Sequence, residues 1–350
     1  MRIDATISYK RICQIGTGQG MNSTVYLIED PQLGGNLAAK EIEKQQLPNP
    51  VAYFAEAQTM FSVAHENVLA IQYACQTPDM IALVMPYLKK GSLEGHSEKG
   101  PLPLGEVIRV TRGVLAGLAH IHLRKFVHFD IKPSNVLFSD RGVPMVADFG
   151  QSREISPTGV VTVPRLYRMT MPPETITTGV ATQVADIYHV GLLMYRALNG
   201  DALFKSQIPP DPAVLRLKIG QGKFPDRQFF MPHVPSRLRT LVRKALHVDP
   251  ADRYQTATEM EDEIGRFGLV LDWSTEPLVT GGYRWQAKRP GLCDLVVELS
   301  TQGPNWTVEI FTEKDGEPRR AKDKKENWRK SLTLGDAYAH LKGVFEGLLE

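Results

Sequence analysis

The first part of the chain has the short alternation of apolar and polar residues that is typical of β-strands. A helical spacing of apolar residues interrupts these runs once, between residues 51 and 64. We therefore expect a strand-rich unit that contains one helix. The predicted strands lie at residues 7–14, 24–28, 38–41, 68–74 and 81–85.

From residue 104 onward the apolar residues recur every three or four positions, which predicts amphipathic helices. A strand-rich beginning followed by a helix-rich stretch favours a two-lobed α+β architecture. The predicted helices lie at residues 105–123, 184–198, 235–246 and 256–267.

The pattern changes again after residue 268, where all four tryptophans of the chain occur. Residues 294–300 and 306–311 alternate around a Gly-Pro-Asn loop, which predicts a hairpin. Thr333 followed by Asp336 predicts a helix start, and an apolar stripe continues to Leu348. We expect domains at 1–267 and 268–350, the second being a small α+β unit with Trp285, Trp306 and Trp328 as core residues.

The composition mainly excludes certain classes of protein. Apolar residues make up 42% and charged residues 23% of the 350 residues, which excludes a wholly disordered chain. The net charge of +2 favours no nucleic-acid partner, and three widely spaced cysteines fit neither a disulfide framework nor a zinc site. The N-terminus lacks the apolar stretch of a signal peptide, and Arg196 interrupts the longest apolar run. We expect a cytoplasmic protein without a membrane segment.

A glycine-rich stretch follows the first predicted strand and contains Gly18 and Gly20, with Ser23 and Val25 after them. Glycines allow a backbone to approach phosphates closely, although such a stretch taken alone is more often a simple hairpin. Lys40 ends an apolar strand and is either an edge-strand residue or a phosphate ligand. Glu56, an acid in a mostly apolar helix, is a candidate partner for Lys40.

A sharper motif is His-Phe-Asp-Ile-Lys-Pro-Ser-Asn, from His128 to Asn135. Asp130 is suited to accept a proton, Lys132 to neutralise a phosphoryl group, and Asn135 to hold a metal ion. Thirteen residues later, Asp148 follows an apolar strand in Ala-Asp-Phe-Gly and is suited to present a carboxylate to Mg²⁺.

Together these motifs resemble those of the eukaryotic-type (Hanks) serine/threonine protein kinases, of the bacterial or phage type, over about residues 8–267. The resemblance implies a bilobal kinase fold, with an N-lobe at about 1–86 and a C-lobe at about 87–267. Pro172-Pro173-Glu174 resembles the end of the activation segment, and the resemblance implies that Arg253 is its buried ion-pair partner. Asp186 resembles the family's helix anchor, with Tyr188 in place of tryptophan. No family is evident for residues 268–350.

The resemblance also implies ATP and Mg²⁺ as cofactors. Asp130 would be the catalytic base, Lys132 would steady the γ-phosphate, and Lys40 would contact phosphates while paired with Glu56. Two groups complete the implied site. The metal ligands would be Asn135 and Asp148, and the nucleotide-binding residues would be Gly18, Gly20, Ser23, Val25, Lys40, Met85, Tyr87 and Leu88.

Two positions depart from the family pattern. Phe129 replaces the arginine that normally receives a phosphate on the activation segment, and Tyr167 stands where relatives have a threonine near Asp130. Loop phosphorylation therefore loses its usual receiver, although residues 151–171 offer several hydroxyls for autophosphorylation. The basic run 319–330 surrounds Trp328 and is either a solvated loop or a nucleic-acid contact.

The sequence thus predicts an ATP-dependent serine/threonine kinase that transfers the γ-phosphate to protein hydroxyls and phosphorylates itself. Three alternatives stay open: an ATP-binding pseudokinase scaffold, a small-molecule kinase of the aminoglycoside type, and a regulatory or toxic kinase of a bacterial or phage system. The expected partner is a protein substrate, without nucleic acid or membrane, and the C-terminal unit is a candidate docking module.

Overall fold

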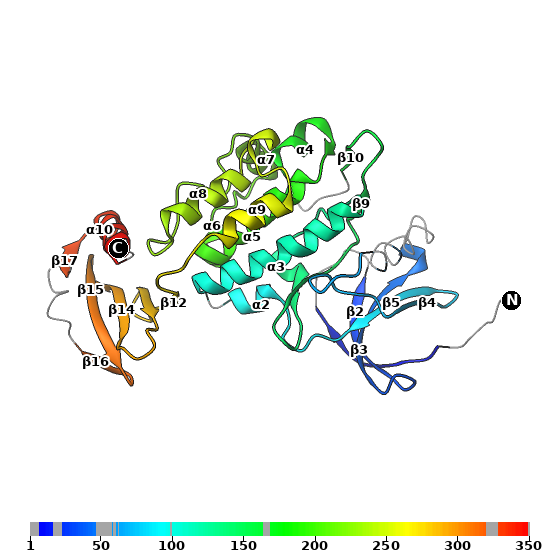
Figure 1. Cartoon of the computed structure of the whole chain (residues 1–350), viewed down its shortest axis with the longest axis horizontal. Helices are drawn as coiled ribbons and strands as arrows, with labels where there is room; N and C mark the ends of the chain where they lie inside the picture. Colours follow the sequence, from blue (N-terminus) through cyan, green and yellow to red (C-terminus); the bar gives the residue numbers. More distant parts are fainter. Residues whose placement is uncertain are drawn as a thin grey trace.

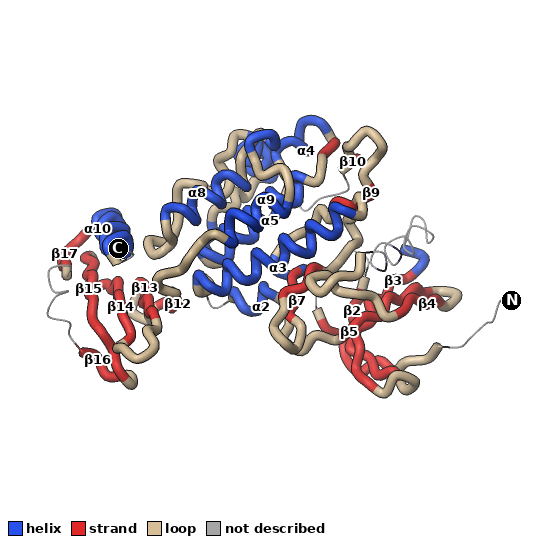
Figure 2. The backbone as a smooth tube through the Cα atoms, in the orientation of Figure 1, coloured by secondary structure: helices blue, strands red, loops and turns tan. Residues whose placement is uncertain are grey.

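The computed structural model describes residues 7–16, 23–46, 58, 61, 63–98, 100–163, 169–319 and 328–348. Three parts follow one another along the long axis in chain order: an antiparallel sheet, a helical body and a second sheet with one helix (Figure 1). Most strands gather at the two ends and most helices in the middle, while α10 lies beside the strands of the C-terminal end (Figure 2). The predicted α+β class and the two-lobed arrangement of the first 267 residues are confirmed.

The N-terminal sheet has five antiparallel strands in the order β1-β2-β3-β5-β4. Asp30 closes its second turn, since its buried carboxylate accepts backbone N–H groups from Gln32 and Leu33 and the Tyr73 hydroxyl. The strands are β1 Lys10–Ile15, β2 Thr24–Asp30, β3 Gly35–Glu43, β4 Tyr73–Gln76 and β5 Met80–Pro86, and the short 3₁₀ helix η1 Lys44–Gln46 follows β3.

One strand prediction was wrong in extent. Residues 68–74 were expected to form a strand, but β4 begins only at Tyr73. Val68 and Leu69 are buried instead, and the Leu69 N–H donates to the Val146 carbonyl of the helical body. Their apolar character therefore reflects packing between the lobes, which alternation along the chain does not distinguish from a strand. Most of the predicted helix 51–64 lies outside the described residues.

The helical body confirms all four long predicted helices. α5 is buried on every side along its whole length, so it forms the centre of the body. α2, α4 and α6 were not predicted, because one or two turns carry little periodicity. α7 was not predicted either, although it is as long as α9. The helices are α2 Leu93–Ser97, α3 Leu104–Leu123, α4 Pro173–Thr178, α5 Val184–Asn199, α6 Asp201–Ser206, α7 Pro212–Gly220, α8 Ser236–Ala245 and α9 Ala257–Gly265, with the 3₁₀ helices η2 Pro133–Asn135 and η3 Pro250–Asp252.

Three small two-stranded ladders lie between these helices and hold the loops of the candidate site. β6 pairs with β9, β7 with β8, and β10 with β11, all antiparallel. Their bounds are β6 Phe126–Val127, β7 Val136–Phe138, β8 Pro144–Val146, β9 Arg153–Glu154, β10 Val161–Thr162 and β11 Val180–Ala181.

The C-terminal sheet runs β12-β13-β14-β15-β16, with β17 also paired to β15. The expected hairpin is β14–β15, and Thr333 caps the C-terminal helix by accepting the Asp336 N–H, as predicted. Gly282 is required, because a Cβ there would lie 1.9 Å from the Leu299 carbonyl oxygen. The elements are β12 Trp273–Pro277, β13 Gly282–Ala287, β14 Asp294–Gln302, β15 Asn305–Lys314, β16 Glu317–Arg319, β17 Arg329–Leu332 and α10 Leu334–Gly347.

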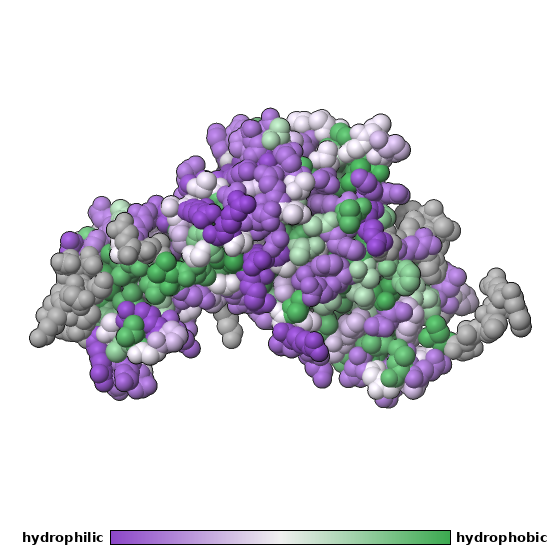
Figure 3. All heavy atoms as spheres, in the orientation of Figure 1, coloured by the Kyte–Doolittle hydropathy of each residue, from purple (hydrophilic) through white to green (hydrophobic). Residues whose placement is uncertain are grey.

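This C-terminal unit packs against the helical body and shares a hydrophobic core with it. Trp285 is buried as predicted, whereas Trp306 and Trp328, which were also expected in the core, are only partly buried. Trp273 is buried as well. Half-buried apolar residues such as Phe229 and Tyr338, whose ring centroids lie 6.0 Å apart, extend the contact. In Figure 3 apolar residues form a continuous band from the C-terminal unit toward the helical body.

Within the part of the chain that the structure describes, no helix combines the length and apolar character needed to cross a membrane. Most of the basic run 319–330 lies outside the described residues, so its role stays a prediction.

Candidate active site

The loop from His128 to Asn135 connects β6 to β7 and contains η2. Asp186, at the start of α5, anchors this loop. The Asp186 carboxylate accepts the backbone N–H groups of His128 and Phe129, each at 2.8 Å. It also contacts His122 Nε2 at 2.8 Å and is fully buried. Burial opposes its ionisation, but the hydrogen bond from His122 and further contacts lower the pKa of Asp186 overall. A charged acceptor therefore fixes the loop.

Asp130, Lys132 and Asn135 come together within this loop. Lys132 Nζ donates to Asp130 Oδ2 at 2.8 Å, and Asn135 Nδ2 donates to the same oxygen at 2.8 Å. Asn135 also donates to the Asp130 carbonyl oxygen at 2.9 Å. Because η2 turns the chain directly after Lys132, residues two and five positions beyond Asp130 can face it. The predicted triad thus forms one polar cluster.

Asp148 follows β8 and has a backbone φ of +65°, a left-handed conformation that is uncommon for residues other than glycine. Lys40 from β3 donates to its Oδ1 at 2.7 Å. Burial opposes ionisation of the carboxyl, but the Lys40 ammonium outweighs this effect and lowers the pKa of Asp148 to about 2. Lys40 therefore joins the N-terminal sheet to the helical body through an ionised carboxylate.

A cavity of about 340 Å³ lies between the two lobes and reaches this ion pair. Apolar residues from both lobes line it, including Val25 and Ala38 on one side and Leu137 and Ala147 on the other. Asp130 and Lys132 adjoin it through Asn135. The predicted site residues on its wall are Ser23, Val25, Lys40, Met85, Tyr87, Leu88, Asn135 and Asp148.

Three predicted site residues cannot be placed. Gly18, Gly20 and Glu56 lie outside the described residues, and so does Tyr167. Lys40 is seen paired with Asp148, and its expected pairing with Glu56 stays a prediction.

The donor set at the inner end of the cavity fits a hard divalent cation. An ionised carboxylate and an amide oxygen, from Asp148 and Asn135, are the ligand types that Mg²⁺ accepts alongside phosphate oxygens. Among the described residues, no group of three or more His, Cys, Asp or Glu side chains could hold a metal alone.

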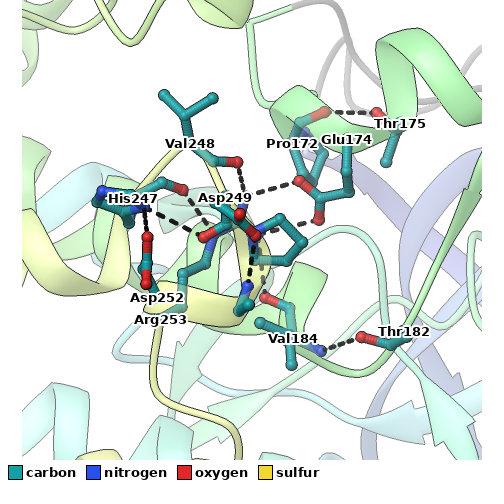
Figure 4. A network of polar contacts seen from close by, with 12 residues as sticks. Pro172, Glu174, Thr175, Thr182, Val184, His247, Val248, Asp249, Asp252 and Arg253 are labelled. Carbon is teal, nitrogen blue, oxygen red and sulfur yellow. Dashed lines mark hydrogen bonds and ion pairs between the residues drawn. The ribbon is translucent and has the colours of Figure 1, made fainter.

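A second polar network joins Glu174, at the start of α4, to residues 247–253 (Figure 4). Arg253 donates to both carboxylate oxygens of Glu174, at 2.9 and 2.6 Å, and to the carbonyl oxygens of His247 and Val248. Its side chain is buried against the Tyr188 ring, 4.9 Å from the ring centroid. The expected pairing of Glu174 with Arg253 is confirmed, and it fixes the end of the segment that begins at Asp148.

Sequence reasoning missed two kinds of residue. His122 contributes to the Asp186 anchor, but a histidine near the end of a helix gives no signal of such a contact. The apolar walls Leu69, Leu137 and Ala147 were also missed, although their positions beside the Asp130 and Asp148 motifs could have indicated them.

Comparison with known proteins agrees with this geometry. Residues 9–263 match the protein kinase domain family. The chain is 30% identical over 261 residues to the serine/threonine-protein kinase PrkC of Bacillus subtilis, covering 73% of this chain and 40% of PrkC. It is 31% identical over 294 residues to the serine/threonine-protein kinase PknL of Mycobacterium tuberculosis, covering 81% of this chain and 70% of PknL.

The chain thus spans less than half the length of PrkC but more than two thirds of PknL. The family match covers most of the chain and ends before the C-terminal sheet begins. The chain belongs to the protein kinase family, and within it to the Hanks-type serine/threonine kinases.

Proposed function

We propose that this chain is an active kinase that transfers the γ-phosphate of ATP to serine and threonine hydroxyls of proteins, its own included. One observation carries the proposal: the cluster of Asp130, Lys132 and Asn135 adjoins the Lys40–Asp148 ion pair at the inner end of one cavity. A base candidate, cationic groups and metal ligands thereby converge on one point, and phosphoryl transfer needs this convergence.

The cavity suggests how the nucleotide would bind. The apolar walls around Val25, Ala38 and Leu137 suit the flat faces of adenine, and the backbone of residues 85–88 offers hydrogen-bonding groups at its edge. Lys40 would contact the phosphates at the inner end. In this proposal Gly18 and Gly20 cover the phosphates from above, and Glu56 supports Lys40.

The reacting hydroxyl is assigned to Asp130. Lys132 and Asn135 both donate to Oδ2 of Asp130. The substrate hydroxyl would therefore donate to the other carboxylate oxygen, Oδ1. Asp130 orients the hydroxyl and accepts its proton, while the ammonium of Lys132 lies within reach of the transferred phosphoryl group and stabilises its charge. Asn135 holds the Asp130 carboxylate in place through its side-chain amide.

Asn135 and Asp148 are the proposed Mg²⁺ ligands. Bound Mg²⁺ would neutralise negative charge on the β- and γ-phosphates. Because its pKa is about 2, Asp148 is ionised and ready to bind a cation at every pH at which the protein would be assayed.

The C-terminal unit is proposed to be an accessory domain that is fixed to the C-lobe. Its tryptophans share the C-lobe core, and Trp285 Nε1 donates to Nδ1 of the buried C-lobe residue His233 at 2.9 Å. Docking of a partner protein by this unit stays a prediction.

The test is incubation with γ-labelled ATP and Mg²⁺. The wild-type protein should label itself or added casein on serine or threonine. Asp130→Asn and Asp148→Asn should each reduce the transfer rate at least about 100-fold. The first removes the base that accepts the hydroxyl proton, and the second removes the charged ligand of Mg²⁺.

Asp140→Asn is the matched control, since this exposed aspartate lies in the turn between β7 and β8, and its transfer rate should equal that of wild type. Binding of ATP by the wild type without label on any protein would contradict the proposal and favour a scaffold role. Label on a small-molecule alcohol instead would favour the small-molecule kinase.

A further inference from the structure

A small apolar cluster lies apart from the main core, directly beside the Asp130 loop. Its centre is Phe129, the residue between His128 and Asp130, whose side chain is 0% exposed. Partly buried apolar residues complete the cluster at its rim. The members are Val127, Phe129, Val161, Ala181 and Ala185, with Ile155 and Val163 packed against them.

This cluster joins segments that are far apart in the sequence. Ile155, Val161 and Val163 belong to the stretch that follows Asp148, here called the 155–163 segment, whereas Ala181 and Ala185 lie in β11 and α5. Backbone hydrogen bonds follow the same connections. The Ile155 N–H donates to the Lys125 carbonyl at 2.7 Å, and the Val163 N–H donates to the Gly179 carbonyl at 3.1 Å.

The backbone of Phe129 is held as firmly as its side chain. Its φ is +67°, a left-handed conformation that is a genuine outlier for a bulky side chain. Its N–H donates to the buried Asp186 carboxylate at 2.8 Å. Asp130 is the next residue, so any displacement of Phe129 moves the Asp130 carboxylate.

We propose that Phe129 is a positioning residue. The 155–163 segment packs against its ring, and this packing fixes the position of the segment relative to Asp130. The inference rests on the proposed function, because it assigns Asp130 a reacting hydroxyl. Apolar packing against Phe129 needs no charge on the 155–163 segment. It therefore orders the segment before any hydroxyl of the segment is modified.

The test compares Phe129→Ala with Phe230→Ala by two measurements. Phe230 is another buried phenylalanine, beside Tyr195 in the C-lobe, and serves as the matched control because it belongs to the main core and not to the small cluster. Hydrogen exchange at the amides of Ile155 and Val163 reports docking of the segment. The second measurement is kcat together with the dissociation constant for ATP, both taken well below the unfolding temperature of each variant.

Phe129→Ala should raise exchange at Ile155 and Val163 at least about 10-fold and lower kcat by about 10- to 100-fold, because small misplacements of a reacting group are costly. ATP binding should change less than about twofold, because the described residues that line the nucleotide cavity do not include Phe129. Phe230→Ala should change neither the exchange rates of these two amides nor kcat. Phe129→Leu should restore both toward wild type, because it refills the cluster with an apolar side chain.

Val161→Ser approaches the cluster from the segment side and keeps the test decisive if Phe129→Ala fails to fold. It should raise the same exchange rates and lower kcat. Exchange at Ile155 and Val163 that stays at the wild-type rate in either folded variant would overturn the proposal. If the wild-type protein transfers no phosphate, the proposed function fails, and the exchange rates still decide whether Phe129 holds the segment.

Discussion

At the scale of single residues, Asp186 does more than its place in the sequence suggests. One buried carboxylate accepts two backbone N–H groups of the Asp130 loop and contacts His122. A buried carboxylate is costly unless it is compensated, and three hydrogen bonds provide that compensation. The loop is therefore held through its backbone, independently of the side chains that would do the chemistry.

Asp186→Asn should lower the free energy of unfolding by about 3 kcal/mol, because an amide nitrogen cannot accept an N–H and leaves one buried donor without a partner. Urea unfolding at neutral pH measures the change. Asp211→Asn is the control: Asp211 caps exposed helix α7, and asparagine caps helices equally well. Equal stability of wild type and Asp186→Asn would refute the anchoring role.

At the scale of elements, α3 connects the C-terminal unit to the Asp130 loop. Its N-cap position is Pro103, which has no side-chain hydrogen-bonding group, and its last residues lead directly into β6. Asp272, just before β12, supplies the missing cap from a distance, since its Oδ1 accepts the Gly105 N–H at 2.8 Å. A carboxylate at a helix start also interacts favourably with the helix dipole.

Asp272→Ala should therefore lower the free energy of unfolding by about 1 kcal/mol, the usual cost of losing a cap. The exposed Asp315→Asn, in the turn after β15, should leave stability unchanged, because asparagine tolerates the left-handed backbone found there. Thermal unfolding of both variants beside wild type provides the measurement. A wild-type melting temperature for Asp272→Ala would show that the cap is dispensable.

At the scale of the whole molecule, the C-terminal unit is part of the folded core. His233 from the C-lobe lies 2% exposed among Thr275, Trp285 and Phe345 of that unit. Trp285 donates to Nδ1, so the neutral imidazole carries its hydrogen on Nε2, which faces the Thr275 hydroxyl at 3.4 Å. Burial and the nearby Arg239 lower the pKa of His233 to about 3.

This buried imidazole makes stability depend on pH. The folded pKa lies below the unfolded value of about 6.5, so the unfolded chain takes up the proton first as pH falls. The contribution is complete above about pH 6.5 and declines between there and pH 3. From neutral pH to pH 5, wild type should lose about 2 kcal/mol more than His233→Gln.

Urea unfolding at the two pH values gives the comparison. Trp285→Phe is the control, since it keeps the buried imidazole and should keep the wild-type pH dependence from a lower starting stability. An equal loss of unfolding free energy in wild type and His233→Gln would mean that His233, between the C-lobe and the C-terminal unit, does not cause the pH dependence.

The local elements of this protein could be predicted from neighbouring residues along the chain. The period of its apolar residues placed the long helices and the β14–β15 hairpin. The pair of Thr333 and Asp336 placed the cap of the C-terminal helix. Neighbouring residues alone decide these elements. Fixed spacing within one loop likewise placed Asp130, Lys132 and Asn135 together, since a single turn brings them into contact.

The long-range contacts could be seen only in the folded chain. Val68 and Leu69 pack between the lobes instead of forming the predicted strand, and His122 contacts Asp186. Phe129 lies in a small apolar cluster. Asp272 caps a helix that begins 168 residues before it. The physical reason is common to all four: burial and hydrogen bonding act between surfaces, and the chain pattern does not record which surfaces meet.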